Sequence, residues 1–241
     1  MTTTIKSQLR AIVIPLLHAH AHAMPVRRAR ALAIRASLVA LALLLAAAGC
    51  GSNDGVVRPG ESINRGWAAF RQGDYEQAEA HFLAALEVDS TLAEAHSGLG
   101  WSRGFDGRFD EAVASFERAV ILDTNDPDAA GGLAAAALAS GDTEGAVTGA
   151  EIALAVDPGW VFPHRSGVDF EDLRLIIAQA RSLDGEYADA QDQVDLLDPE
   201  NGLDPGRPAT WVVADVAYGS YREALLAELV DIEKRVGAAL P

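Results

Sequence analysis

A repeat of 34 residues constrains this 241-residue chain more than any other feature. Four sets of identical residues recur at that spacing without a break: Gly73, Gly107 and Gly141; Ala78, Ala112 and Ala146; Ala85, Ala119 and Ala153; Asp89, Asp123 and Asp157. Thirty-four residues is the length of one helical hairpin in a stacked array, in which each hairpin buries its apolar face against the next. The sequence therefore predicts an all-α solenoid of helix-turn-helix units, a fold that offers a surface to another chain.

Three contiguous units are predicted, over residues 59–92, 93–126 and 127–160. A small residue recurs in the first helix of each unit, where it lets the paired helices approach, and a glycine ends that helix in the left-handed conformation. The second helix has an apolar stripe at i, i+4, i+7 and i+8, so one face is committed to the core. The small residues are Gly66, Gly100 and Ala134, and the stripes are Ala78, Phe82, Ala85 and Leu86, then Ala112, Phe116, Ala119 and Val120.

These features resemble the tetratricopeptide repeat. The resemblance implies that the first helix of every hairpin lines a concave surface and that the second helix lies outside it. One departure is that Ser62, His96 and Ala130 stand where the family has a large aromatic residue. A second is that Ala150 replaces the phenylalanine of the first two units. The third unit also carries extra glycines, and we expect its helices to be the least stable of the three.

The period slips after Trp160, where the spacing predicts an insertion at 161–170 and a fourth, irregular hairpin at 171–197. A loop is expected at 198–208, followed by a C-terminal capping helical segment at 209–237. Trp211 to Tyr218 is interpreted as a separate helix or as the start of the capping helix. The expected apolar seam of that helix is Leu225, Leu226, Leu229, Ile232 and Val236, with Arg222, Glu223, Glu228 and Glu233 on the other side.

The N-terminal part, 1–49, has the layout of a leader: basic residues, an apolar run from Leu38 to Ala48, then small residues before Cys50. This order is typical of an export signal. Because it ends in Gly-Cys, it resembles a bacterial lipoprotein signal peptide, although Ala47 stands where that family prefers leucine. Met24 opens a signal of ordinary length, whereas Met1 gives a long one, so either residue can be the start.

The lipoprotein resemblance implies that Cys50 becomes the acylated N-terminus and is the lipid attachment site. The alternatives are an unmodified thiol or a plain secretory signal cut nearby. Residues 50–58 are too polar and glycine-rich to bury a core, so they are expected to be a flexible tether. The expected location is the bacterial cell envelope, anchored in a membrane by lipid such as palmitate. Lipoproteins of that family without an aspartate after the cysteine are often sent to the outer membrane, so the resemblance and Gly51 together imply its periplasmic face if the host has two membranes.

Charge and composition exclude several classes of function. All 35 Asp and Glu follow Cys50, with only 13 of the 19 Lys and Arg, which gives that part a net charge of −22. Such a surface repels nucleic acid. No nucleophile with a neighbouring base, phosphate-binding loop or metal-ligand spacing is recognisable, so no enzyme activity, cofactor or metal is expected. His81, His96 and His164 are interpreted as ordinary, partly exposed histidines. Asp198, Glu200, Asn201 and Asp204 favour a solvated acidic loop over a calcium site.

The resemblance carries over to a candidate partner groove on the first helices. Its predicted residues are Ile63, Trp67, Phe70 and Arg71 in the first unit, Ser97, Trp101, Gly104 and Phe105 in the second, and Gly131, Ala135 and Leu138 in the third. Trp67 and Trp101 lie one period apart and are expected to be neighbours on one wall. The sequence leaves open whether these aromatic side chains are free to bind a partner or pack against neighbouring helices and the 161–170 insertion.

Two functions remain open at this stage. The first is a lipid-anchored adaptor, a monomer, whose aromatic groove binds an apolar or amphipathic segment of a protein or peptide partner with basic flanks. The second is a structural protein of envelope assembly whose groove is filled by its own chain and which acts through its convex face.

Overall fold

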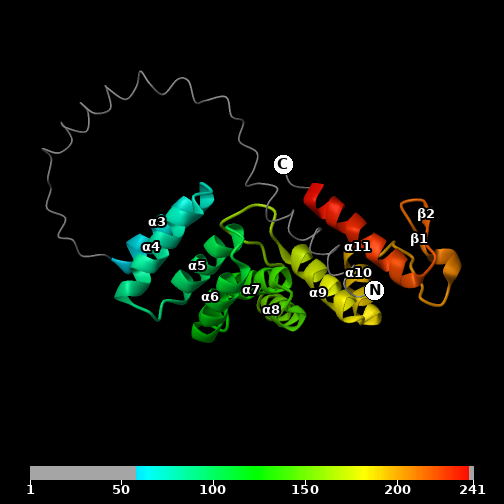
Figure 1. The fold of residues 1–241 in the computed structure, drawn as a ribbon, viewed down its shortest axis with the longest axis horizontal. Coiled ribbons are helices and arrows are strands. Elements are labelled where there is room, and N and C mark those ends of the chain that lie inside the picture. Colours follow the sequence, from blue (N-terminus) through cyan, green and yellow to red (C-terminus); the bar gives the residue numbers. More distant parts are fainter. Residues whose placement is uncertain (1–57, 239–241) are drawn as a thin grey trace, which may run out of the picture.

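The computed structural model describes residues 58–238, with side chains up to Arg235. The predicted leader, the lipid attachment site Cys50 and all of the tether except Arg58 lie outside this part. The described helices follow one another as antiparallel hairpins, which confirms the all-α solenoid (Figure 1). They are α3 Pro59–Arg71, α4 Tyr75–Val88, α5 Ala93–Phe105, α6 Phe109–Leu122, α7 Pro127–Ser140, α8 Thr143–Val156, α9 Phe170–Asp184, α10 Tyr187–Leu197 and α11 Tyr221–Ala238.

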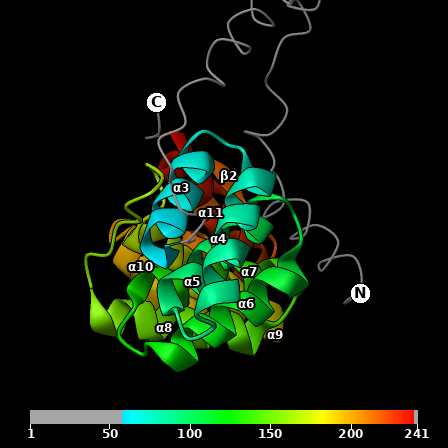
Figure 2. The ribbon, with the colours of Figure 1, turned by 90° about the vertical axis from the view of Figure 1, so that its left-hand side faces the viewer.

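The hairpins stack in sequence order from α3 to α11, as Figure 1 shows. Each helix packs against the next one in the chain, and the first helices α3, α5, α7 and α9 also contact one another in succession. Viewed from its N-terminal end, the solenoid presents α3 and α4 in front of the later hairpins (Figure 2). One apolar core therefore runs through the three predicted units and into α9.

The turns of the hairpins have the chemistry that the sequence predicted. Gly73, Gly107, Gly141 and Gly185 each follow a first helix with φ between +78° and +93°, a region that only glycine adopts at little cost. Aspartates also cap four of the described helices: the side chains of Asp74, Asp126, Asp142 and Asp169 accept hydrogen bonds from backbone amides of the first turns of α4, α7, α8 and α9. These short-range signals set the hairpin boundaries.

The two phenylalanines of the second helices fill notches in the first helices. Phe82 lies between Gly66 and Gly98, where an added Cβ would come within 2.7 Å and 2.3 Å of the ring. Phe116 lies between Gly100 and Gly132 in the same way, at 2.8 Å and 2.3 Å. The small residues thus admit a phenyl ring between hairpins, which locks neighbouring units in register.

In the third unit, the two helices of the hairpin approach each other more closely, and Ala150 stands where the first two units have this phenylalanine. Ala150 is fully buried, and a Cβ built on Gly149 would lie 2.8 Å from the carbonyl oxygen of Ala130 and 2.8 Å from the amide nitrogen of Ala134. Those atoms are backbone, so they cannot turn aside as a side chain can. Helices α7 and α8 are therefore in near-backbone contact at Gly149.

Replacing Gly149 by alanine is expected to lower the free energy of unfolding by about 2 kcal/mol, because the new methyl group forces the helices α7 and α8 apart. The matched control is Gly104→Ala, since a Cβ there meets only the Cβ of Ala112 at 3.9 Å. That change should stabilise the protein, by up to about 1 kcal/mol, through helix propensity alone. Urea denaturation followed by circular dichroism measures both. Equal shifts of one sign in the two variants would contradict this account of the third unit.

The C-terminal region forms a second apolar cluster around Leu175, Val194, Leu225 and Leu229. Here one prediction is wrong: Trp211 to Tyr218 is not helical. A short 3₁₀ helix, Pro208–Thr210, leads into the antiparallel strands β1 Val212–Val213 and β2 Val216–Ala217. The turn between them has positive φ at Ala214 (48°) and Asp215 (64°), as a two-residue hairpin turn requires. The capping helix itself, α11, begins at Tyr221.

The polar side of α11 also differs from the prediction. Leu225, Leu229 and Ile232 are buried as expected, but Glu228 is buried with them. Arg235, two helical turns after Glu228, donates to Glu228 at 3.1 Å and to Asp198 at 2.6 Å. Glu233 is partly buried too, and burial raises its pKa to about 7. The end of α10 covers this face of α11, so a carboxylate predicted in solvent lies in an ion-pair network.

Candidate functional site

The candidate site is the inner wall formed by the first helices, where Trp67 of α3 and Trp101 of α5 occupy equivalent positions. Each indole N–H donates to a residue 27 positions later, at the start of the next first helix. Trp67 Nε1 donates to Glu94 Oε1 at 3.1 Å, and Trp101 Nε1 donates to the carbonyl oxygen of Asp128 at 3.2 Å. The polar edge of either ring is thus satisfied within the solenoid, and its apolar face is left for packing.

The aromatic residues predicted for the groove do come together. The ring of Phe70 lies 5.6 Å from that of Trp67 and 5.4 Å from that of Phe105, and Phe105 stacks against Trp101 at 6.0 Å between centroids. Tyr75, at the start of α4, extends the cluster by stacking on Phe105 at 5.5 Å. Two repeats therefore build one continuous aromatic wall.

This wall is covered by residues 160–169, here called the covering segment, which overlap the insertion predicted at 161–170 and lie between α8 and α9. Phe162, only 2% exposed, stacks on Trp101 with 4.0 Å between centroids. The same ring meets Trp67 edge-on at 6.2 Å and Phe70 at 6.0 Å. Phe162 is thus the central side chain of the site, although the sequence did not single it out.

The next residues of the covering segment bind the outer part of the wall. His164 lies flat on Trp67, with 3.7 Å between ring centroids, and its Nδ1 is 3.2 Å from Arg71 Nη1. Arg165 places its guanidinium 4.5 Å from the centre of the Phe105 ring and donates to the Tyr75 hydroxyl at 2.9 Å. His164, predicted to be an ordinary, partly exposed histidine, therefore docks on the first repeat, and Arg165, without a predicted role, docks across the first two repeats.

The predicted groove residues fall into three groups by burial. Seven are buried: Ile63, Trp67, Phe70, Ser97, Trp101, Gly131 and Leu138. Gly104, Phe105 and Ala135 are partly buried, and Arg71 is exposed. Leu138 lies in the core of the third unit and has no part in the aromatic wall. Of the two arrangements that the sequence left open, the structure has the one in which the chain covers its own wall.

Trp160 fixes the first end of the covering segment on the third repeat. Its indole N–H donates to Asp128 Oδ1 at 2.6 Å, and its ring occupies the space above Gly131. Burial raises the pKa of the Asp128 carboxyl, which the Trp160 hydrogen bond partly offsets. The other end is fixed by Asp169, which caps α9 and whose backbone amide donates to Asp172.

Lowering the pH from 7.5 to 5 is expected to loosen the covering segment. Burial and the nearby Arg71 lower the pKa of His164 from 6.5 to about 4, so the docked ring stays neutral where a free histidine becomes charged. Docking therefore loses stability as the pH falls from about 6.5 towards 4, and no further below that. Acrylamide quenching of tryptophan fluorescence should rise over this range. His164→Phe keeps the stacked ring without a titration, so an equal rise in that variant would contradict the assignment.

The part of the chain that the structure describes contains no candidate metal site and no candidate membrane-spanning helix. Within residues 58–238, no three His, Cys, Asp or Glu side chains are grouped so that they could hold a metal ion. In the loop that follows α10, Asp198 pairs with Arg235 and Asp204 with Arg207 at 3.1 Å. The same range contains no helix with the length and apolar character needed to cross a bilayer.

Comparison with known families agrees with this geometry. Two tetratricopeptide repeat families match the chain, one over residues 61–92 and one over residues 106–160. The chain is a tetratricopeptide repeat protein. No curated protein sequence matches it. Among solved structures, YrrB, described as a TPR protein with an unusual peptide-binding site, is 20% identical with a TM-score of 0.53, and the alignment covers 71% of this chain and 84% of YrrB.

Two further solved structures resemble this tetratricopeptide repeat protein. The MamA protein is 18% identical with a TM-score of 0.53, over 76% of this chain and 96% of MamA. A mutant O-GlcNAc transferase from Thermobaculum terrenum is 24% identical with a TM-score of 0.44, over 53% of this chain and only 23% of the transferase. At these identities the likeness of YrrB and MamA establishes the fold alone.

Proposed function

We propose that this tetratricopeptide repeat protein is a non-catalytic scaffold that binds a protein partner in the bacterial cell envelope, where lipid on Cys50 anchors it. Tetratricopeptide repeats are in general protein-interaction scaffolds. The observation that carries the proposal is the aromatic wall of the first two repeats, which accommodates a loop of the chain through Phe162, His164 and Arg165. A wall that holds one such segment has the shape and chemistry to hold another.

The proposed partner presents an apolar or amphipathic segment with basic flanks. The apolar part suits Trp67, Trp101 and Phe70, since aromatic anchors in a desolvated site contribute most of the binding energy. The basic flanks suit a protein whose part after Cys50 has a net charge of −22 and which therefore attracts cations over a long range. The protein binds this partner as a monomer.

The lipid anchor is tested by Cys50→Ser. We expect the wild-type protein to sediment with membranes and to incorporate labelled palmitate, and the variant to do neither, because one acylated residue holds the chain at the bilayer. Circular dichroism should be unchanged, since Cys50 precedes the folded repeats. A wild-type protein without label, or a variant that stays in the membrane fraction, would contradict the lipid anchor. Separation of inner from outer membranes then tests the outer-membrane location that Gly51 favours.

A second candidate function follows from the covering segment itself. Because Phe162 already fills the wall, the protein could act in envelope assembly through its convex face, with the covering segment as a permanent part of the fold. Photo-crosslinking in cells separates the two functions. A crosslinking amino acid at Arg71, on the wall side, should capture a partner if the groove binds it, whereas one at Glu117, exposed on α6, should do so if the convex face does. No captured protein at either position would overturn the scaffold function.

Truncating both wall tryptophans does not test binding cleanly. Trp67 and Trp101 are each 4% exposed and pack into the core, so alanine at both positions is expected to unfold part of the solenoid. Loss of a partner in that variant would then report on folding. Experiments on the wall are better made through the covering segment, which touches the same rings from outside.

A further inference from the structure

We infer that the covering segment is an intramolecular ligand of the wall and that a partner segment of the same chemistry displaces it. The shared chemistry is an aromatic residue, a flat ring two positions later, and an arginine directly after that ring. This inference rests on the proposed scaffold function and specifies its partner. In the chain itself the pattern is Phe162, Pro163, His164 and Arg165.

The first argument is that side chains alone hold the covering segment on the first two repeats. Phe162, His164 and Arg165 contact α3, α5 and the start of α4 through rings, the Arg71 hydrogen bond and the Tyr75 hydroxyl. Within the described residues, the backbone hydrogen bonds of this segment join it to itself, to Asp157 and to the start of α9, and not to the first two repeats. The Phe162 amide donates to the carbonyl oxygen of Val168, and the Phe170 amide donates to that of Trp160.

These backbone bonds make a small antiparallel loop with a bridge between Val161 and Asp169. Gly167, at φ +78°, turns the chain at its tip. Because the loop carries its own hydrogen bonds, it can leave the wall without exposing unpaired backbone groups. Its base stays attached through Trp160 on Asp128 and through the cap of α9. The covering segment is therefore a loop attached at both ends that packs on the wall through side chains only, and it is called the flap from here on.

The second argument concerns the apolar surface that the wall exposes when the flap is open and the kind of segment that would cover it. Lifting Phe162 and His164 leaves the rings of Trp67, Trp101 and Phe70 facing water as one apolar patch, and such patches mark interaction sites. The chemistry of the replacement is set by the three subsites that the flap leaves. They are a slot against Trp101 for an aromatic ring, the face of Trp67 beside Arg71 for a flat neutral ring, and the Phe105 and Tyr75 pair for a guanidinium.

A tethered ligand competes with a free one through its high local concentration. The wall is then available to a partner only in the fraction of molecules whose flap is open, and the apparent affinity falls by that fraction. Binding is therefore predicted to be weak in the wild-type protein and to increase when the flap is weakened.

The test uses the full chain and a synthetic peptide with the sequence of residues 161–168, Val-Phe-Pro-His-Arg-Ser-Gly-Val, labelled with fluorescein. This peptide lacks tryptophan, so all tryptophan fluorescence comes from the protein, where Trp67 and Trp101 belong to the wall. The flap variant is Phe162→Ala with Arg165→Ala, and the matched control is Val161→Ser, since Val161 neighbours Phe162 but is 60% exposed. We expect the flap variant to bind the peptide about tenfold or more tightly than the wild type or the control. In the flap variant, bound peptide should also lower the quenching of the protein's tryptophan fluorescence by acrylamide.

Three results would overturn the inference. One is equal affinity, or no affinity, in all three proteins. Another is binding of a peptide with alanine in place of its Phe and Arg as tightly as the original. The third is a dimer of the flap variant or the wild type in which a second copy supplies the segment, measured by sedimentation. If Phe162→Ala disturbs folding, as circular dichroism reports, the single change Arg165→Ala replaces it, because Arg165 is only partly buried. That variant should still bind the peptide a few-fold more tightly than the wild type.

Failure of this inference is distinguishable from failure of the proposed function. A crosslinked partner at Arg71 without peptide binding by the flap variant refutes only the inferred partner chemistry. Peptide binding by the flap variant without any crosslinked protein in cells refutes the scaffold function and leaves the flap as an intramolecular ligand.

Discussion

Replacing Phe116 by alanine is expected to lower the free energy of unfolding by about 4 kcal/mol, the cost of removing a fully buried ring and leaving a cavity. Phe116 is 1% exposed, lies between Gly100 and Gly132, and meets Trp101 edge-on at 5.4 Å. It therefore contacts both the second and the third unit. Because a solenoid is held together by contacts between neighbours, the loss at this position also weakens the coupling of those two units.

Urea denaturation followed by circular dichroism measures this loss, and Phe109→Ala is the matched control. Phe109 lies in the same helix, α6, but is partly exposed, so its truncation should cost less than about 2 kcal/mol. A broadened transition in Phe116→Ala would indicate that the units before and after the cavity unfold separately. Equal losses in the two variants would contradict the assignment of Phe116 as the contact that locks the second unit to the third.

The sequence predicted the parts of the fold that depend on local, repeated signals. The left-handed turns at Gly73, Gly107 and Gly141 and the buried faces of α4 and α6 agree with the structure because each needs only residues within one hairpin. The boundaries of the first six helices follow from the same signals. Phe82 and Phe116 were placed in the core for the same reason, although the glycine pairs that receive them come from two different hairpins.

Two errors lie in the C-terminal region, where the repeat no longer gives a register. The run from Val212 to Ala217 is apolar enough to suit a helix, and the hairpin turn at Ala214 and Asp215 contains no glycine to mark it. Glu228 is expected in solvent because of its charge, although it lies three residues after Leu225 and four before Ile232, beside the face that they bury. Its ion-pair network includes Asp198, 30 residues earlier, and that contact is one that no periodic pattern reveals.

In the candidate site, too, contacts between residues far apart in the sequence could not be predicted from the repeat. The period placed Trp67, Trp101 and Phe105 on one wall, but it could not say where an insertion of irregular sequence would lie. Phe162 reaches Trp67 across 95 residues of chain, past the third repeat. The available signal was the composition of the insertion itself, which brings Phe162, His164 and Arg165 together in an acidic chain.

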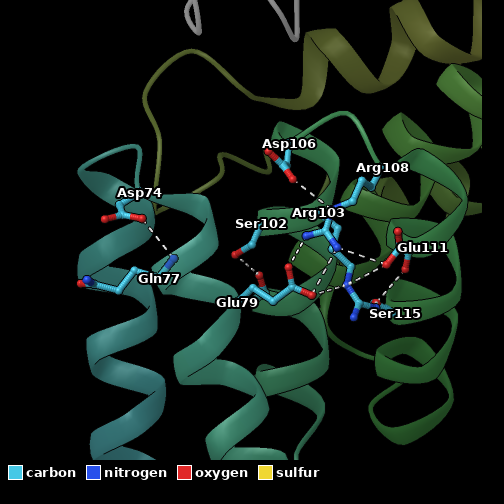
Figure 3. Close-up of polar contacts among 10 residues, drawn as sticks. Asp74, Gln77, Glu79, Ser102, Arg103, Asp106, Arg108, Glu111 and Ser115 are labelled. Atoms are coloured by element: carbon cyan, nitrogen blue, oxygen red, sulfur yellow. Dashed lines mark hydrogen bonds and ion pairs between the residues drawn. The ribbon is translucent and has the colours of Figure 1, made fainter.

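Glu79 binds two arginines at the junction of the first two units (Figure 3). Its side chain, on α4, is only 15% exposed; Oε1 accepts from Arg103 Nε at 3.0 Å, and Oε2 pairs with Arg108. Arg103 also donates to Ser115 at 2.9 Å, and Arg108 donates to Glu111 at 3.2 Å, so the network joins α4, α5 and α6. Burial alone would raise the pKa of Glu79, but the hydrogen bonds and charges of Arg108 and Arg103 outweigh it and hold that pKa below 4.5.

Replacing Glu79 by alanine is expected to lower the free energy of unfolding by about 3 kcal/mol, because two partly buried guanidinium groups lose their shared carboxylate. Glu79→Gln keeps an acceptor, so its loss should be smaller. The matched control is Glu61→Ala, since Glu61 pairs with Arg65 at the surface, where both side chains are more than half exposed, and its loss should stay below about 0.5 kcal/mol. A carboxylate with a lowered pKa stabilises the fold above its unfolded value and loses that effect as the pH falls. The difference between the wild type and Glu79→Ala, measured by urea denaturation, should therefore shrink below about pH 4.5. A difference that stays constant from pH 7 to pH 3 would show that packing, and not charge, accounts for the loss.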